Sequence, residues 1–118
     1  MAVIEMGANH KGEIAYLTRI ARPTVGLVNN AGPAHLEGFG SLTGVAEGKG
    51  ELFAGLPEGA TAVINADDRF APLWRKLAAE RSVIRFGLDA PRADVSAHWK
   101  GDGTGSQLML KTPAGEAA

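Results

Sequence analysis

The chain has 118 residues, of which 45% are hydrophobic and 21% charged, with a formal net charge of −1 and no cysteine. This length and composition suit one globular domain. The near-neutral charge gives no support to a nucleic-acid or anionic-membrane surface, and the lack of cysteine excludes disulfides and thiolate metal sites. No apolar run approaches the roughly 20 residues that a membrane-spanning helix needs.

The first half of the chain alternates between strand and helix patterns. Residues 2–6 are a short apolar run that predicts a buried strand, and residues 13–21 carry apolar side chains at helical spacing. Residues 24–28 predict a second strand. Ser41 predicts the cap of a helix that extends to about residue 56.

The second half begins in the same way and then changes character. Residues 60–64 and 83–86 predict two more strands, with a helix between them that is capped by Asp67 or Asp68. This alternation predicts an α/β fold over about residues 1–90, a three-layer structure with helices flanking a parallel sheet. Alternating apolar residues over about 94–112 predict an appended antiparallel β-hairpin.

The two ends of the chain suggest how it is organised. Met1 leads directly into the first strand pattern, and residues 112–118 trail off after the last one. A compact domain with short termini would also give such ends. We expect instead a piece of a longer protein.

Polar residues follow three of the predicted strands. Because ligands gather beyond the carboxyl ends of the strands in open α/β sheets, we expect a site at this edge. A single such residue would be a turn former or a helix cap, but three neighbouring strands favour a site. The polar residues are Glu5, Asn9 and His10 after the first strand, Asn29, Asn30 and His35 after the second, and Asn65, Asp67 and Asp68 after the third.

Glu5 and His35 are the candidate metal ligands. A carboxylate within an apolar strand must be exposed at the strand end, paired, or bound to a cation. Hard oxygen ligands suit Mg²⁺, which usually shares phosphate oxygens and keeps several waters. The alternatives are a pair between Glu5 and Lys11 or an arginine, and a loop histidine without a ligand. The place of His35 after the neighbouring strand favours a ligand.

Lys49 lies on the apolar face of its predicted helix, between Leu42 and Leu56 on the helical wheel. A lysine there must reach out to solvent, pair, or be modified. Gly48 and Gly50 on either side weaken the helix and suggest the close approach of another group.

Two glycine-rich segments are not phosphate-binding loops. Residues 44–50 have three residues between the glycines where a P-loop has four, and a glycine follows the lysine in place of Ser or Thr. Residues 101–105 precede no helix, so they are not a dinucleotide fingerprint. The chain alone is therefore expected to bind nucleotides poorly.

Four segments together resemble the Mur ligase family. They are Ala-Val-Ile-Glu-Met-Gly-Ala-Asn-His (2–10), Pro-Ala-His-Leu-Glu-Gly-Phe-Gly (33–40), Glu-Gly-Lys-Gly-Glu-Leu-Phe (47–53) and Ile-Asn-Ala-Asp-Asp (64–68). The similarity covers nearly the whole chain, is densest up to Asp68 and is weak after Asp89. The first two segments together resemble the branch of the family that adds D-Ala-D-Ala to a UDP-MurNAc-peptide.

The resemblance implies a part of the central ATP-binding domain, which is P-loop NTPase-like, of a bacterial cytoplasmic ligase that makes peptidoglycan precursors. The P-loop would lie before Met1 and a C-terminal domain after Ala118, so the fragment alone would be inactive. The whole enzyme would use ATP and Mg²⁺ to form an acyl phosphate, which the amine of D-Ala-D-Ala attacks.

The resemblance also implies roles for individual residues. Glu5 would be a ligand of the Mg²⁺ at the ATP phosphates and His35 a ligand of a second Mg²⁺, which a carbamylated Lys49 would help to hold. Asn65 would lie near the adenine with Asp67 beside it in the nucleotide site, and Asn9 and His10 would face the peptide substrate or the γ-phosphate.

Two alternatives stay open from the sequence. One is another ligase of the same superfamily, such as a folylpolyglutamate or cyanophycin synthetase, although the Asn-His after Glu5 argues against it. The other is a non-catalytic α/β binding module in which the polar strand ends serve only as caps.

Overall fold

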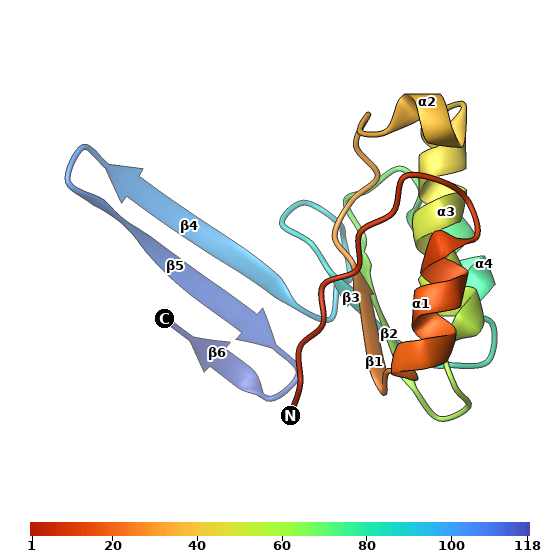
Figure 1. Ribbon diagram of the computed structural model, residues 1–118. Helices are drawn as coiled ribbons and strands as arrows, with labels where there is room; N and C mark the ends of the chain where they lie inside the picture. The colour runs from red at the N-terminus through yellow and green to blue at the C-terminus, as the bar shows by residue number, and fades with distance from the viewer.

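The computed structural model describes residues 1–118, which form a parallel sheet with helices on it and a separate antiparallel sheet (Figure 1). The parallel sheet has the order β1-β2-β3. Its strands are β1 (Val25–Val28), β2 (Thr61–Asn65) and β3 (Ser82–Phe86). The predicted α/β class and the parallel pairing of these three strands are confirmed.

Four helices accompany the parallel sheet, and none is long and apolar enough to cross a membrane. They are α1 (Glu13–Ala21), α2 (Leu36–Phe39), α3 (Leu42–Gly55) and α4 (Ala71–Ala78). Ser41 caps α3 as predicted, since its side chain accepts a hydrogen bond from the Gly44 N–H at 3.0 Å. The one-turn helix α2 was not predicted from the sequence.

The longer helices α1, α3 and α4 lie on one side of the parallel sheet (Figure 1). The strands follow one another across the sheet in chain order, and successive right-handed crossovers in one direction place their helices on the same face. Val25 and Leu27 on the opposite face are more than half exposed. The second helical layer of the predicted three-layer structure is therefore not found among residues 1–118.

The predicted strand at residues 2–6 is wrong for this chain. These residues run past β1 without joining a ladder, and the side chains of Val3 and Ile4 are 90% and 62% exposed. Only Met6 and Ala8 of this region pack against the core. An apolar run indicates a segment suited to burial, but a strand also needs a partner for its backbone groups, which these residues do not have.

The core lies between the helices and the sheet and is centred on Trp74 and Phe53, both fully buried. Their rings make an edge-to-face contact with centroids 6.3 Å apart, and the Trp74 indole N–H donates to the Ala46 carbonyl at 2.9 Å. A Cβ at Gly50 would overlap the Leu77 side chain. The close approach predicted for the glycines beside Lys49 is thus confirmed at Gly50, where α4 packs on α3.

The turn before α4 differs from the predicted helix cap. The helix begins at Ala71, with Phe70 rather than an aspartate at its N-cap. Asp68 instead shapes the turn that precedes the helix, because its Oδ1 accepts the Phe70 N–H at 2.8 Å. Its short carboxylate competes for local N–H groups, which is why aspartate favours such turns.

The C-terminal part is a three-stranded antiparallel sheet rather than the predicted hairpin. It consists of β4 (Ser96–Asp102), β5 (Gly105–Thr112) and β6 (Gly115–Ala117). The hairpin strands β4 and β5 are confirmed. The third strand was missed because the two-residue turn that brings the chain back onto β5, Pro113-Ala114, has none of the Asn-Gly or Gly-Gly pairs that mark a hairpin in a sequence. This sheet extends away from the helices (Figure 1).

Replacing Trp74 by alanine should lower the free energy of unfolding by about 3–5 kcal/mol, because it removes the largest fully buried side chain. Urea unfolding followed by circular dichroism measures the change. Trp99→Ala is the matched control, since Trp99 is 64% exposed and its loss should change the free energy by less than ~0.5 kcal/mol. Equal effects of the two variants would contradict this assignment of the core.

Candidate functional site

The carboxyl ends of β1 and β2 meet at one edge of the sheet, as the sequence predicts. Val28 pairs with Ile64 in the parallel register, so Asn29 and Asn65 leave the sheet side by side. The Asn65 amide donates to the Asn29 carbonyl at 2.7 Å and accepts the Asp67 N–H at 2.9 Å. Asn65 therefore ties the two strand exits together.

Lys49 reaches the same edge from α3. Its side chain is half-buried, and its Nζ donates to the Asn30 carbonyl at 2.7 Å. This hydrogen bond to a backbone oxygen at the end of β1 compensates for the partial burial of the charged amine. A Cβ at the neighbouring Gly48 would overlap the Phe39 ring, so the other flanking glycine also admits a close neighbour.

Two adjacent aspartates organise the loops around this edge. The Asp67 carboxylate accepts the N–H groups of Leu88, Asp89 and Ala90 at 2.6–3.3 Å. These hydrogen bonds, that of Leu88 above all, hold the pKa of Asp67 below its usual range. Asp68 Oδ2 accepts the Ala31 N–H at 2.9 Å, which joins the exit of β1 to the turn before α4.

The loop that carries Asn9 and His10 is held by carboxylates. Glu13 accepts the Asn9 N–H at 2.6 Å and the His10 N–H at 3.1 Å, and these bonds, the first above all, lower the pKa of Glu13. Glu51 of α3 accepts two N–H groups at the start of α1, at 2.7 and 3.0 Å. It neutralises unsatisfied donors and complements the positive end of the helix dipole.

Three acidic side chains that contact this loop and the start of α1 were not predicted from the sequence: Glu13, Glu47 and Glu51. Glu13 is the first residue of α1, and its carboxylate reaches back to the N–H groups of Asn9 and His10 in the loop before the helix. Glu51 and Glu47 act across 36 residues or more, and no local pattern marks them. Lys11 forms its ion pair with Glu47 and not with Glu5, the partner considered from the sequence.

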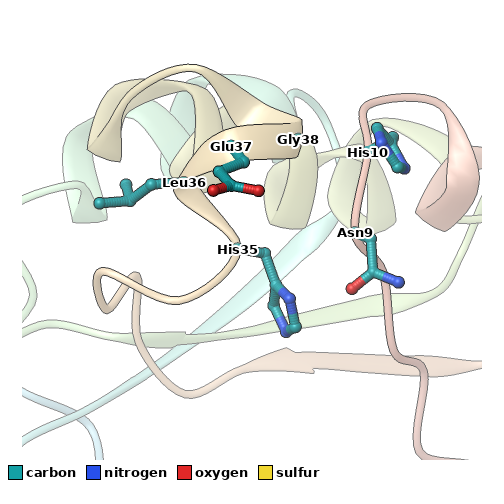
Figure 2. Close-up of a pocket in the computed structure, with 6 residues that line it drawn as sticks. All are labelled: Asn9, His10, His35, Leu36, Glu37 and Gly38. Carbon is teal, nitrogen blue, oxygen red and sulfur yellow. The ribbon is translucent and has the colours of Figure 1, made fainter.

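An open hollow of about 470 Å³ lies between this loop and α2 (Figure 2). In Figure 2 the Asn9 amide and the His35 ring extend toward the same side. The loop and the helix approach closely because position 38 is glycine, where a Cβ would overlap the Asn9 carbonyl. The hollow is lined by Asn9, His10, His35, Leu36, Glu37 and Gly38.

The sequence-predicted residues therefore fall into three places. Lys49, Asn65 and Asp67 come together at the sheet edge, and His35, Asn9 and His10 at the hollow. Glu5 lies on the exposed segment before the loop. No group of three or more histidine and acidic side chains lies close enough to hold a metal ion.

The donor chemistry still fits a nucleotide-bound Mg²⁺. Such an ion is usually held by one or two protein oxygens and completes its shell with phosphate oxygens and water. The exposed Glu5 carboxylate is an oxygen donor of the right kind for that sharing, whereas His35 offers an imidazole nitrogen, which Mg²⁺ accepts less readily. They do not amount to an all-protein cage.

The comparison with known families defines the class of the protein. Residues 1–117 match the family described as the Mur ligase middle domain. The chain belongs to this family. The match covers both the parallel sheet with its helices and the antiparallel sheet.

Within that family the chain is similar to one kind of ligase. It is 49% identical to the UDP-N-acetylmuramoyl-tripeptide--D-alanyl-D-alanine ligase of Escherichia coli K12 over 97% of its length. It aligns with the crystal structure of MurF from Acinetobacter baumannii at a TM-score of 0.88, with 32% identity over 98% of the chain and 25% of that structure. A MurF ligase from Thermotoga maritima in complex with ADP gives 0.80, with 30% identity over 96% of the chain and 26% of that structure. The chain spans about a quarter of the length of the curated relatives it matches.

The lowered pKa of Asp67 predicts the pH at which its hydrogen bonds to residues 88–90 are lost. The hydrogen bonds to Leu88, Asp89 and Ala90 stabilise the fold fully above the unfolded pKa, about 3.9, and this contribution is lost as the pH falls through the lower folded pKa. The amide chemical shifts of these residues should therefore titrate together, with a midpoint below about 3.9.

An NMR titration measures this midpoint, and Asp67→Asn should abolish the shared transition. A midpoint at or above the ordinary aspartate value would show that the carboxylate does not hold the loop in solution.

Proposed function

We propose that this chain is part of the central ATP-binding domain of a ligase that joins D-alanyl-D-alanine to a UDP-MurNAc-peptide in the bacterial cytoplasm, for peptidoglycan synthesis. The similarity to the E. coli ligase supports the substrates. The observation in the structure that carries the proposal is the Lys49 amine, held 2.7 Å from the Asn30 carbonyl at the sheet edge. A P-loop and a C-terminal domain would be supplied by other parts of the longer protein.

The reaction follows from the substrate chemistry. The terminal carboxylate of the UDP-MurNAc-peptide attacks the γ-phosphorus of ATP, ADP leaves, and an acyl phosphate forms. The amine of D-Ala-D-Ala then attacks the acyl carbon, the C–O bond to phosphate breaks, and the amine loses one proton. Bringing two anions together is the difficult part, so the catalyst must mainly position groups and neutralise charge.

In this proposal the residues of the hollow and the sheet edge divide the work. Glu5 would hold the Mg²⁺ at the ATP phosphates and His35 a second Mg²⁺; when bound, these ions neutralise phosphate and carboxylate charge. Asn9 and His10 would face the peptide carboxylate or the γ-phosphate. Asn65 would lie near the adenine, with Asp67 fixing the loop beside it.

Lys49 would act as a carbamate. Its neutral amine adds to CO₂, forming one N–C bond and releasing one proton, which replaces a cation by a carboxylate. The carbamate nitrogen keeps one N–H, so the hydrogen bond to the Asn30 carbonyl can persist. A carboxylate at this edge would help to hold the ion that His35 binds.

The rival functions have less support. A folylpolyglutamate or cyanophycin synthetase would use the same ATP chemistry, but the identity of 49% over almost the whole chain favours the D-alanyl-D-alanine ligase. A non-catalytic module would account for the hydrogen bond of Lys49 to the Asn30 carbonyl, but the similarity to the ligases over almost the whole chain favours an enzyme. The effect of Lys49→Ala on turnover distinguishes a ligase from a non-catalytic module.

In the longer ligase, Lys49→Ala should lower kcat by about 100-fold or more, because the carbamate carboxylate that helps to hold the second ion is lost. Added formate or acetate should restore part of the activity by occupying the place of the carbamate. Lys76→Ala, an exposed lysine of α4, is the control and should behave as wild type. Normal activity of Lys49→Ala would refute the carbamate role.

The chain of residues 1–118 should by itself show no ATP hydrolysis and no ligase turnover, because it contains no phosphate-binding loop. It should bind Mg²⁺ only weakly, since no three protein ligands converge. Phosphate release and isothermal titration calorimetry measure these quantities. Measurable turnover would show that residues 1–118 do contain a phosphate-binding site.

A further inference from the structure

The turn that leaves β1 is held by side chains from three other parts of the fold. Each contact involves a backbone group of one of three consecutive residues, so the path of the chain toward His35 is fixed before α2 begins. The hydrogen bonds run from Asn65 Nδ2 to Asn29 O (2.7 Å), from Lys49 Nζ to Asn30 O (2.7 Å) and from Ala31 N to Asp68 Oδ2 (2.9 Å).

Two of these bonds share one peptide group. The carbonyl of Asn30 and the N–H of Ala31 belong to the same planar unit, in which they point in opposite directions. Lys49 holds the carbonyl end and Asp68 holds the N–H end. A rotation of this plane would break both bonds at once.

Asp68 is well placed to prevent such a rotation. It is half-buried, and its second oxygen accepts the Phe70 N–H at 2.8 Å, which anchors it to the turn before α4. Its negative charge at the N–H end and the ammonium of Lys49 at the carbonyl end polarise the peptide group in the same direction. Each bond therefore strengthens the other.

We propose that Asp68 is a positioning residue: by fixing the Asn30–Ala31 peptide plane, it holds the Lys49 amine at the sheet edge. The proposal concerns the geometry of Lys49 and rests on the proposed function only for its catalytic meaning. Asp68 itself touches neither substrate nor metal in this scheme.

The test is the reactivity of the Lys49 amine in the chain of residues 1–118. Trace acetylation followed by peptide mass spectrometry gives the labelling of Lys49 relative to exposed Lys76 in the same molecule. An asparagine at position 68 has one acceptor oxygen and cannot serve both N–H groups. Asp68→Asn should therefore raise the Lys49 to Lys76 ratio about three- to tenfold, the change expected from one lost hydrogen bond.

Two further variants sharpen the test. Asp94→Asn is the matched control, because Asp94 also accepts a backbone N–H, that of Arg85 at 2.7 Å, but contacts no residue of the β1 exit; its ratio should stay at the wild-type value. Asp68→Ser keeps a short acceptor for Phe70 but not the reach to Ala31, and should raise the ratio even if Asp68→Asn fails to fold. An unchanged ratio in a folded Asp68 variant overturns the proposal.

The longer ligase separates this inference from the proposed function. A less firmly held Lys49 needs more CO₂ to stay carbamylated, so added bicarbonate should restore part of the activity that Asp68→Asn loses. If labelling of Lys49 rises but bicarbonate has no effect, Asp68 positions the lysine and the carbamate in the proposed function is refuted.

Discussion

The close packing of α3 against its neighbours is the constraint on which the rest of the structure depends. At four glycines in this helix, an added Cβ would come too close to residues outside the helix. Gly48 and Gly50 in the helix interior each cost about 0.5–1 kcal/mol relative to alanine, so the close packing lowers the intrinsic stability of the helix. The contacts are Gly44 with the Phe39 carbonyl, Gly48 with the Phe39 ring, Gly50 with Leu77 and Trp74, and Gly55 with Thr18.

This proximity brings long side chains of α3 to the edge of the sheet and to the loop before α1. Lys49 projects to the end of β1, while Glu47 and Glu51 hold the loop and the first turn of α1. One helix thus sets the relative positions of the sheet edge and of the loop beside the hollow. A substitution that moved α3 outward would disturb both together.

Local signals in the sequence were reliable where the physics is local. Ser41 caps its helix and Lys49 is half-buried as its place on the helical wheel predicts, because cap chemistry and helical periodicity act over a few residues. The partner of Lys49, the Asn30 carbonyl 19 residues away, is not marked by any local pattern. The N-terminal strand failed because pairing requires a partner that an apolar run does not specify. The role of Asp67 in holding residues 88–90 also lies beyond local patterns. The positions of Glu5 and His35 after strand patterns made them candidate metal ligands, but the particular roles proposed for them and for Lys49 rest on family resemblance.

The antiparallel sheet differs from the rest of the molecule in what supports it. None of the residues 96–118 is buried, and the sheet joins the body through the bridge between Phe86 and Val95. Its strands depend mainly on backbone pairing, since cross-strand neighbours such as Trp99 and Leu108 remain largely exposed. Opening of this region therefore requires less free energy than opening of the core. Strands β4, β5 and β6 can therefore open and close without disturbing the parallel sheet. The hydrogen bond between Lys49 and the Asn30 carbonyl would persist while they do so.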